Sequence, residues 1–384
     1  MKTKKPTLAL SGSEDLRACW DRVVRRRSFL QNLGVVGAAV PAGALLTAQS
    51  QAQSTILVPG DIAILRFLAA AEIIETDLWQ QYNELGGEDS GGNNAYKEAL
   101  ENIDDDIPRY IEDNTQDEMS HGAFLNAYLI AKGAPPVSLE AFRTLPSSQA
   151  TGAQQKGRLT NLMNLNVDTS WYTRYRSSTN PDLGATFPQA VNINNEPGIP
   201  LNDTDTPPDM EQPIPPVTDQ QKRMQAIANT AAFHFAFIEQ GGSSLYASMA
   251  LKVTGLEALR IVISIGGVEV NHFAIWHDAL GGAVSGDLAG VTDPETGVTF
   301  PNLNEPPFGG DLFETELVMP EPCDFILKAF PKCSVIRPTL PQNAGAMAAV
   351  QALTADGLFQ GQSQGFFDTL NQLARAADAA TRGL

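Results

Sequence analysis

Six side chains with the chemistry of metal ligands recur in a regular order along the 384-residue chain. Two Glu-x-x-His motifs alternate with two single glutamates, and each histidine lies one helical turn beyond its glutamate, on the same face. Carboxylate oxygen combined with imidazole nitrogen suits iron or manganese better than metals that prefer thiolates. The pattern therefore predicts two divalent cations, held by Glu72, Glu118, His121, Glu239, Glu269 and His272.

Four segments with helical periodicity must position these side chains. The first ends at Gly86-Gly87, a typical helix stop, and the third begins with Thr218 or Asp219 as its N-cap. No segment alternates convincingly with period two, so we expect an all-α core. The predicted helices are residues 61–85, 104–132, 219–253 and 256–280.

Each predicted helix places at least one of the glutamates on its apolar face. Glu72, for example, interrupts a stripe that contains Leu65, Leu68 and Trp79. An ionised carboxylate in a dry bundle centre is costly unless it is paired or bound to a metal, and these faces offer no nearby Lys or Arg. Two cations would neutralise the cluster directly. The alternative interpretation is that the motifs lie on solvated helix faces, or that the histidines are satisfied within the core.

Glu75, one turn after Glu72, is a further candidate, either as an additional ligand or as an acid beside the ligands. His234 and His277 each lie five residues from a ligand candidate, which is about 140° around a helix. We therefore expect these two histidines outside the metal set.

An aromatic residue follows a ligand candidate by seven residues on every helix, at Trp79, Tyr128, Tyr246 and Trp276. Two turns span about 10 Å along a helix axis. The four rings could therefore form one layer on one side of the metal site and relay electrons. Packing in the bundle core is the alternative interpretation.

The connection between the second and third helices, residues 133–217, is unusually long. Its middle, residues 154–176, is predicted to be helical, whereas the prolines between Pro181 and Pro216 exclude regular structure in its second half. A bundle with one long crossover at this point has the ferritin-like topology. Residues 283–384 are predicted to form a Gly/Pro-rich extension that ends in one or two helices within residues 344–382.

Motifs from all four helices resemble those of bacterial ferritin-like domain proteins related to plant desiccation-related proteins. The matching segments are residues 67–75 (FLAAAEIIE), 117–121 (DEMSH), 239–242 (EQGG, followed by Tyr246) and 268–272 (VEVNH). The resemblance covers about residues 55–282 but not the Pro-rich insertion or the last hundred residues. It implies a ferritin-like four-helix bundle with a dinuclear site at the six residues named above. Both glutamates of the first helix recur in the family, so Glu75 stays a candidate.

Residues 1–52 are predicted to be an export signal. Arg25-Arg26-Arg27-Ser28-Phe29-Leu30 resembles the twin-arginine motif, an apolar Gly/Ala-rich stretch follows at residues 33–46, and Ser50-Gln51-Ala52 offers small residues for cleavage. An amphipathic first helix with a basic end is the alternative. We expect a periplasmic or secreted protein, exported by the twin-arginine pathway.

Charge and cysteine content limit the partners and the further structural features that we expect of this protein. Eight of the 26 basic and three of the 44 acidic side chains lie in the predicted signal, so a net charge of −18 becomes −23 for the rest of the chain. So acidic a chain argues against a nucleic-acid partner, and no apolar run is long enough for a membrane span. After export we expect a disulfide between Cys323 and Cys333, with a reduced pair or metal thiolates as alternatives.

These observations favour a redox-active centre of two Fe or Mn ions. The expected partner is a small oxygen species, dioxygen or peroxide, and the expected activity is that of an oxidase, peroxidase or catalase-like protein. The alternatives are a metal-binding or desiccation-protective protein without turnover, and a structural bundle whose Pro-rich loops bind a partner. A homo-oligomer is compatible with the sequence, whereas the large insertions disfavour an iron-storage shell.

Overall fold

The computed structural model describes residues 57–175, 188–207, 214–305, 326–333 and 344–383. These residues form helices and isolated β-bridges, with no strand among them, as the all-α prediction requires. Two predictions fall outside the described residues. The export signal lies wholly within residues 1–56, and Cys323 lies in the gap before residue 326, so the disulfide with the exposed Cys333 stays a prediction.

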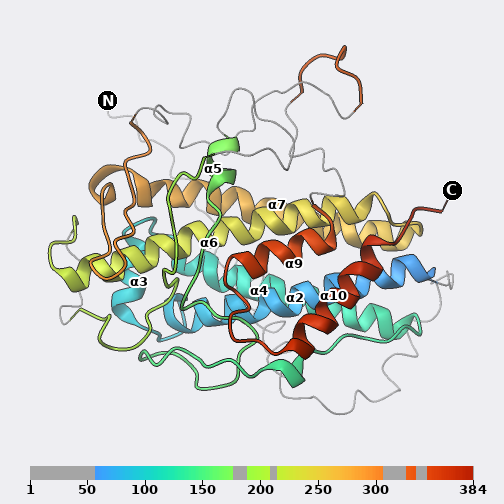
Figure 1. Ribbon diagram of the computed structural model, residues 1–384, viewed down its shortest axis with the longest axis horizontal. Helices are drawn as coiled ribbons and strands as arrows, with labels where there is room; N and C mark the ends of the chain where they lie inside the picture. Colours follow the sequence, from blue (N-terminus) through green and yellow to red (C-terminus); the bar gives the residue numbers. More distant parts are fainter. Residues whose placement is uncertain (1–56, 176–187, 208–213, 306–325, 334–343, 384) are drawn as a thin grey trace, which may run out of the picture. The chain divides into compact units, whose positions relative to one another are not determined.

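Four long helices form the bundle (Figure 1): α2 (Pro59–Gly86), α4 (Ile107–Ala131), α6 (Asp219–Ala250) and α7 (Leu256–Ala279). α2 packs mainly against α4, and α6 packs mainly against α7. The colours of Figure 1 show that α2 and α7 run in one direction and that α4 and α6 run in the other. The connection from α4 to α6 must therefore return along the length of the bundle, which is the predicted ferritin-like crossover.

Local sequence signals explain where these helices begin. α6 starts with a capping box, because the Thr218 hydroxyl accepts from the Gln221 backbone N–H while the Gln221 side chain accepts from the Thr218 N–H. The predicted boundaries of all four helices agree with the structure to within three residues. The short helix α3 (Asn94–Glu101) was not predicted, although Asn93 caps it by accepting from the Tyr96 backbone N–H.

The predicted helix over residues 154–176 is wrong. Of the described residues 154–175, only α5 (Ser170–Tyr175) is helical, and the remainder is irregular chain with isolated bridges, such as that between Leu145 and Arg158. The physical reason is that polar groups of this segment bind the bundle instead of one another. The backbone N–H groups of Leu159 and Thr160, for example, donate to a carboxylate of α2.

Two buried carboxylates of α2 hold the crossover in place. Asp77 accepts from the backbone N–H groups of Leu159 and Thr160, each at 2.9 Å, and pairs with Arg143. Glu84 pairs with both terminal nitrogens of the buried Arg158. The crossover is thereby attached to the helix that also carries Glu72.

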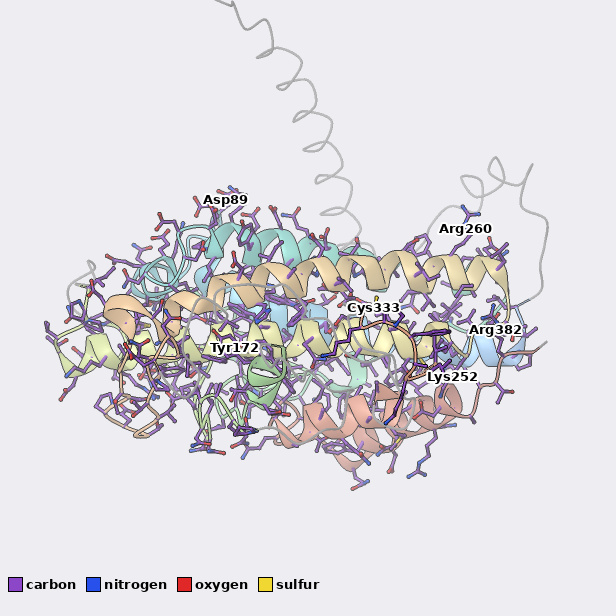
Figure 2. The ribbon with its side chains drawn as sticks, turned by 90° about the horizontal axis from the view of Figure 1, so that it is seen from above. Asp89, Tyr172, Lys252, Arg260, Cys333 and Arg382 are labelled. Carbon is purple, nitrogen blue, oxygen red and sulfur yellow. The ribbon has the colours of Figure 1, made fainter. Side chains whose placement is uncertain are left out.

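The predicted C-terminal helical extension consists of α9 (Ala346–Ala355) and α10 (Gln364–Asp378). α9 contacts α6 and α10 contacts α2, and Figure 2 shows both on the side of α6 that lies away from α7. Asp378 accepts from the backbone N–H groups of Ala346 and Met347, each at 2.9 Å, and pairs with Lys252 just after α6. These contacts attach the two helices to the bundle.

One stretch of the described residues, Leu256–Val284, is by length and composition apolar enough to cross a membrane. A core helix of a globular protein passes the same test. Because α7 packs along α6 and buries Glu269 and His272, we assign this stretch to the bundle.

Replacing Asp77 with Ala is expected to destabilise the fold by about 3–5 kcal/mol, because a buried ion pair and two backbone donors lose their partner. Glu140→Ala is the matched control, since Glu140 pairs with the same Arg143 but is exposed; it should cost less than about 1 kcal/mol. Chemical denaturation followed by circular dichroism measures both. Equal losses would contradict the anchoring role of Asp77.

Candidate metal centre

All six predicted ligand side chains meet at one place inside the bundle. The glutamates expose at most 1% of their surface, His121 exposes 8% and His272 exposes 5%. The solvated-face interpretation of the motifs is therefore wrong. The contributing helices are α2 with Glu72, α4 with Glu118 and His121, α6 with Glu239, and α7 with Glu269 and His272.

The six residues form two overlapping groups of donor atoms. In each group the carboxylate oxygens and the imidazole nitrogen lie within 4.8 Å of one another. Glu118 and Glu269 belong to both groups. Glu72 and His121 complete the first, and Glu239 and His272 complete the second. Shared carboxylates of this kind are what two neighbouring cations require.

Both histidines direct Nδ1 toward the cluster. His121 Nδ1 lies 3.1 Å from Glu118 Oε2 and 3.3 Å from Glu72 Oε2. His272 Nδ1 lies 3.1 Å from Glu118 Oε1, while its Nε2 lies 3.1 Å from Asp117 Oδ2. The Asp117 carboxylate accepts the N–H at Nε2 of His272. Once the proton on Nδ1 is displaced, the lone pair of Nδ1 therefore points at the cluster.

Three carboxylate oxygens of the cluster accept no hydrogen bond from the described residues: Glu72 Oε2 and both oxygens of Glu269. Within the same residues, the ion pairs of the cluster involve histidine and neither Lys nor Arg. A buried carboxylate without such partners is kept only if it is protonated or bound to a cation. Four carboxylates with two imidazoles therefore fit a hard or borderline divalent cation such as iron or manganese.

The pKa values show that it is unfavourable for all the glutamates of the cluster to be ionised at once. Burial, reinforced by Glu118, raises the pKa of Glu72 to about 8, and burial also raises that of Glu269 well above its usual value. Hydrogen bonds from the two histidines outweigh burial at Glu118 and lower its pKa to about 2. The carboxylates in turn outweigh burial at the histidines, raising the pKa of His121 to about 10 and that of His272 to about 12. A cation entering the site must therefore displace protons.

Further polar side chains fix the carboxylates, and the sequence pattern did not single out this role. Asn114 Nδ2 donates to Glu118 Oε1 at 3.1 Å and to Glu239 Oε1 at 3.0 Å. The Tyr246 hydroxyl donates to Glu72 Oε1. Asn114 lies four residues before Glu118, so its place on the same helix face was the available signal. Asp117, which contacts His272, begins the DEMSH motif, but nothing in the sequence assigned it this contact.

A glycine on α6 makes room for the shared carboxylate. A Cβ atom at Gly242 would lie 2.2 Å from Glu269 Oε2, which is far inside contact distance. A Cβ atom at the neighbouring Gly241 would meet nothing within 4 Å. Of the two consecutive glycines, only Gly242 is therefore required by the cluster.

Glu75 belongs to neither donor group but lies beside them. It lines a cavity of about 270 Å³ between α2, α6 and the C-terminal helices, together with Gly242 and apolar side chains such as Phe67 and Leu353. Burial of the carboxyl, and the nearby Glu72, raise the pKa of Glu75 well above its usual value. Glu75 thus faces the cavity, and its carboxyl interacts electrostatically with the cluster.

The predicted single layer of aromatic rings is wrong. Trp79 and Trp276 stack with ring centroids 5.4 Å apart, but Tyr246 contacts a carboxylate of the cluster and Tyr128 stacks on the exposed Phe124. The reason is helix direction. α2 and α7 run opposite to α4 and α6, so a step of seven residues leads toward opposite ends of the bundle.

The other two histidines are also buried but are not part of either donor group. His234 hydrogen-bonds to Tyr82 and Asp356. His277 packs among aromatic rings, including that of Phe273 at a centroid distance of 5.3 Å.

Fold and cluster together define a class of protein: a four-helix bundle with one long crossover, whose centre gathers carboxylates and histidines from every helix. The chain belongs to the ferritin-like domain family, whose sequence model matches residues 60–282. The match spans the bundle from the start of α2 to just beyond α7. Comparisons with curated proteins and with solved structures found no significant match.

Gly242→Ala is expected to push the Glu269 carboxylate out of place and to destabilise the protein by about 1–3 kcal/mol, the usual cost of overpacking a core. Gly241→Ala should instead gain about 0.5–1 kcal/mol, because alanine is the better residue inside a helix. Thermal denaturation of the two variants measures the difference. Equal stability would show that the cluster does not need the space at Gly242.

Proposed function

We propose that this protein is a metalloprotein in which the six buried side chains hold two ions of iron or manganese that react with dioxygen or peroxide. The observation that carries the proposal is Glu269. It is fully buried, it belongs to both donor groups, and neither of its oxygens has a hydrogen-bond partner among the described residues. Bound iron or manganese would supply the redox chemistry with the oxygen species.

The protein's own residues would hold the ions and manage protons. Glu118 and Glu269, which belong to both donor groups, would help to hold both ions, and one further glutamate and one histidine would complete each group. Asn114 and Asp117 orient the ligands, which is the role of outer hydrogen-bond partners in metal sites. Glu75 would donate a proton to an oxygen species that approaches through the cavity, or would serve as an additional ligand.

Purified protein expressed with iron and manganese supplied is expected to carry about two metal ions per chain. Glu118→Gln keeps the shape of the side chain but removes a shared charged ligand, so metal affinity should fall by more than about tenfold. Elemental analysis and calorimetric titration measure content and affinity. Because cations displace protons from the raised-pKa glutamates, affinity should also weaken as the pH is lowered.

Asp113→Asn is the control for this prediction, since Asp113 is an exposed carboxylate on the same helix. Full occupancy in the Glu118→Gln variant would contradict the proposed site.

Peroxide consumption by the metal-loaded protein, lost in that variant, supports the redox function. Full occupancy without turnover would instead support the second candidate, a metal-binding or desiccation-protective protein, which the net charge of −23 outside the predicted signal favours.

We also propose export by the twin-arginine pathway, on the strength of the Arg26-Arg27-Ser28-Phe29-Leu30 motif and the apolar stretch after it. Replacing both Arg26 and Arg27 with Lys should leave the uncleaved protein inside the cell, because the paired arginines are the recognised feature. Arg22→Lys, outside the motif, should not. Fractionation and N-terminal sequencing test this, and normal export of the double variant would refute it.

A further inference from the structure

A buried hydrogen-bonded chain of three residues lies outside the two donor groups. The Tyr82 hydroxyl is 2.8 Å from His234 Nδ1, and His234 Nε2 is 3.1 Å from Asp356 Oδ2. Tyr82 belongs to α2, His234 to α6, and Asp356 follows α9 directly. Each of the three exposes no more than 1% of its surface. Such a polar chain is costly to bury, and metal binding does not explain it.

The chemistry of the three groups fixes the direction of the hydrogen bonds. The Asp356 carboxylate only accepts, so the ring proton of a neutral His234 lies on Nε2. Nδ1 then accepts, and the Tyr82 hydroxyl donates to it. Burial raises the pKa of Tyr82 well above its usual value, so the phenol keeps its proton at neutral pH. A base that can take up that proton, His234 Nδ1, nevertheless lies within hydrogen-bond distance of the hydroxyl.

Aromatic rings connect this chain to the proposed metal site by two routes. The ring centroids of Tyr82 and Phe235 lie 4.6 Å apart, and those of Phe235 and Trp276 also lie 4.6 Å apart. By the second route, the ring centroid of Trp79 lies 5.9 Å from that of Tyr82 and 5.4 Å from that of Trp276. Trp276 Nε1 donates to Asn114 Oδ1 at 2.8 Å, and Asn114 donates to two glutamates of the cluster. Contacting groups thus lead without a break from the phenol to the ligands.

We propose that Tyr82 is a redox-active residue that gives one electron to the oxidised metal centre while its proton moves to His234. The O–H bond of Tyr82 breaks, an N–H bond forms at His234 Nδ1, and the electron passes through the rings and lowers the oxidation state of the centre by one. A neutral phenoxyl radical remains beside an imidazolium that Asp356 stabilises. Return of the electron and the proton restores the starting state.

This inference rests on the proposed function, because the oxidant is the metal centre after its reaction with dioxygen or peroxide. The step stores one oxidising equivalent away from the ligands, in a position closed to solvent. A second tyrosine provides the comparison. Tyr96 is equally buried, but its hydroxyl donates at 2.7 Å to the backbone carbonyl of Gly198, which cannot take up a proton.

The test is electron paramagnetic resonance of the full chain, loaded with metal, reduced and then treated with peroxide. We expect a tyrosyl radical in the wild type and in Tyr96→Phe, and none in Tyr82→Phe. His234→Gln should lower the radical yield by roughly tenfold or more, since the charge-assisted hydrogen bond and the proton acceptor are both lost. Thermal denaturation and metal analysis of each variant show whether it is folded and loaded.

The outcomes separate this inference from the proposed function. A loaded protein whose metal is oxidised without a radical, or whose radical persists in Tyr82→Phe, overturns the inference and leaves the metal site intact. A second measurement uses the metal-free chain with a flash-oxidised ruthenium complex as oxidant. A radical that depends on both Tyr82 and His234 supports the proton-coupled step, and a radical equal in yield in Tyr82→Phe overturns it.

Discussion

The cost of burying charge governs this bundle. Four carboxylates and two imidazoles occupy its centre, and no single side chain can neutralise them. The surrounding residues accommodate that cluster: Gly242 leaves space for Glu269, Asn114 donates to two glutamates, and Asp117 orients His272. A core built only for stability would hold apolar side chains at these positions. These positions are therefore those of the proposed metal site.

The same constraint is met differently elsewhere in the molecule. Asp77 and Glu84 are also buried on α2, but each pairs with an arginine of the crossover. Those pairs attach the long connection to the bundle. The cluster's ligand on the same helix, Glu72, lies about three turns before Glu84. The cluster has no arginine or lysine partner among the described residues. One helix thus carries two kinds of buried acid. Those that pair with an arginine anchor the crossover, and the one without such a partner belongs to the proposed metal site.

The four histidines of the chain divide in the same way. His121 and His272 face the carboxylates of the proposed metal site, whereas His234 faces a phenol on one side and a carboxylate on the other. The fourth, His277, packs among aromatic rings. The stacked Trp79 and Trp276 lie between the two environments. Residues beyond the family's matched region take part as well, because Asp356 and part of the cavity lining, such as Leu353, come from the C-terminal extension.

The sequence by itself determined the four bundle helices and the inward face of each, because helical periodicity and the Glu-x-x-His spacing are local properties. A spacing of seven residues carries no information on helix direction, so by itself it predicted a layer of rings that the antiparallel helices do not form. The sequence also could not determine the tertiary contacts that replace a helix over residues 154–176. Only the tertiary structure brought Tyr82 to His234, 152 positions away, and His234 to Asp356, 122 positions away. Local patterns record which face of a helix is buried. They do not record which distant residue the fold places against it.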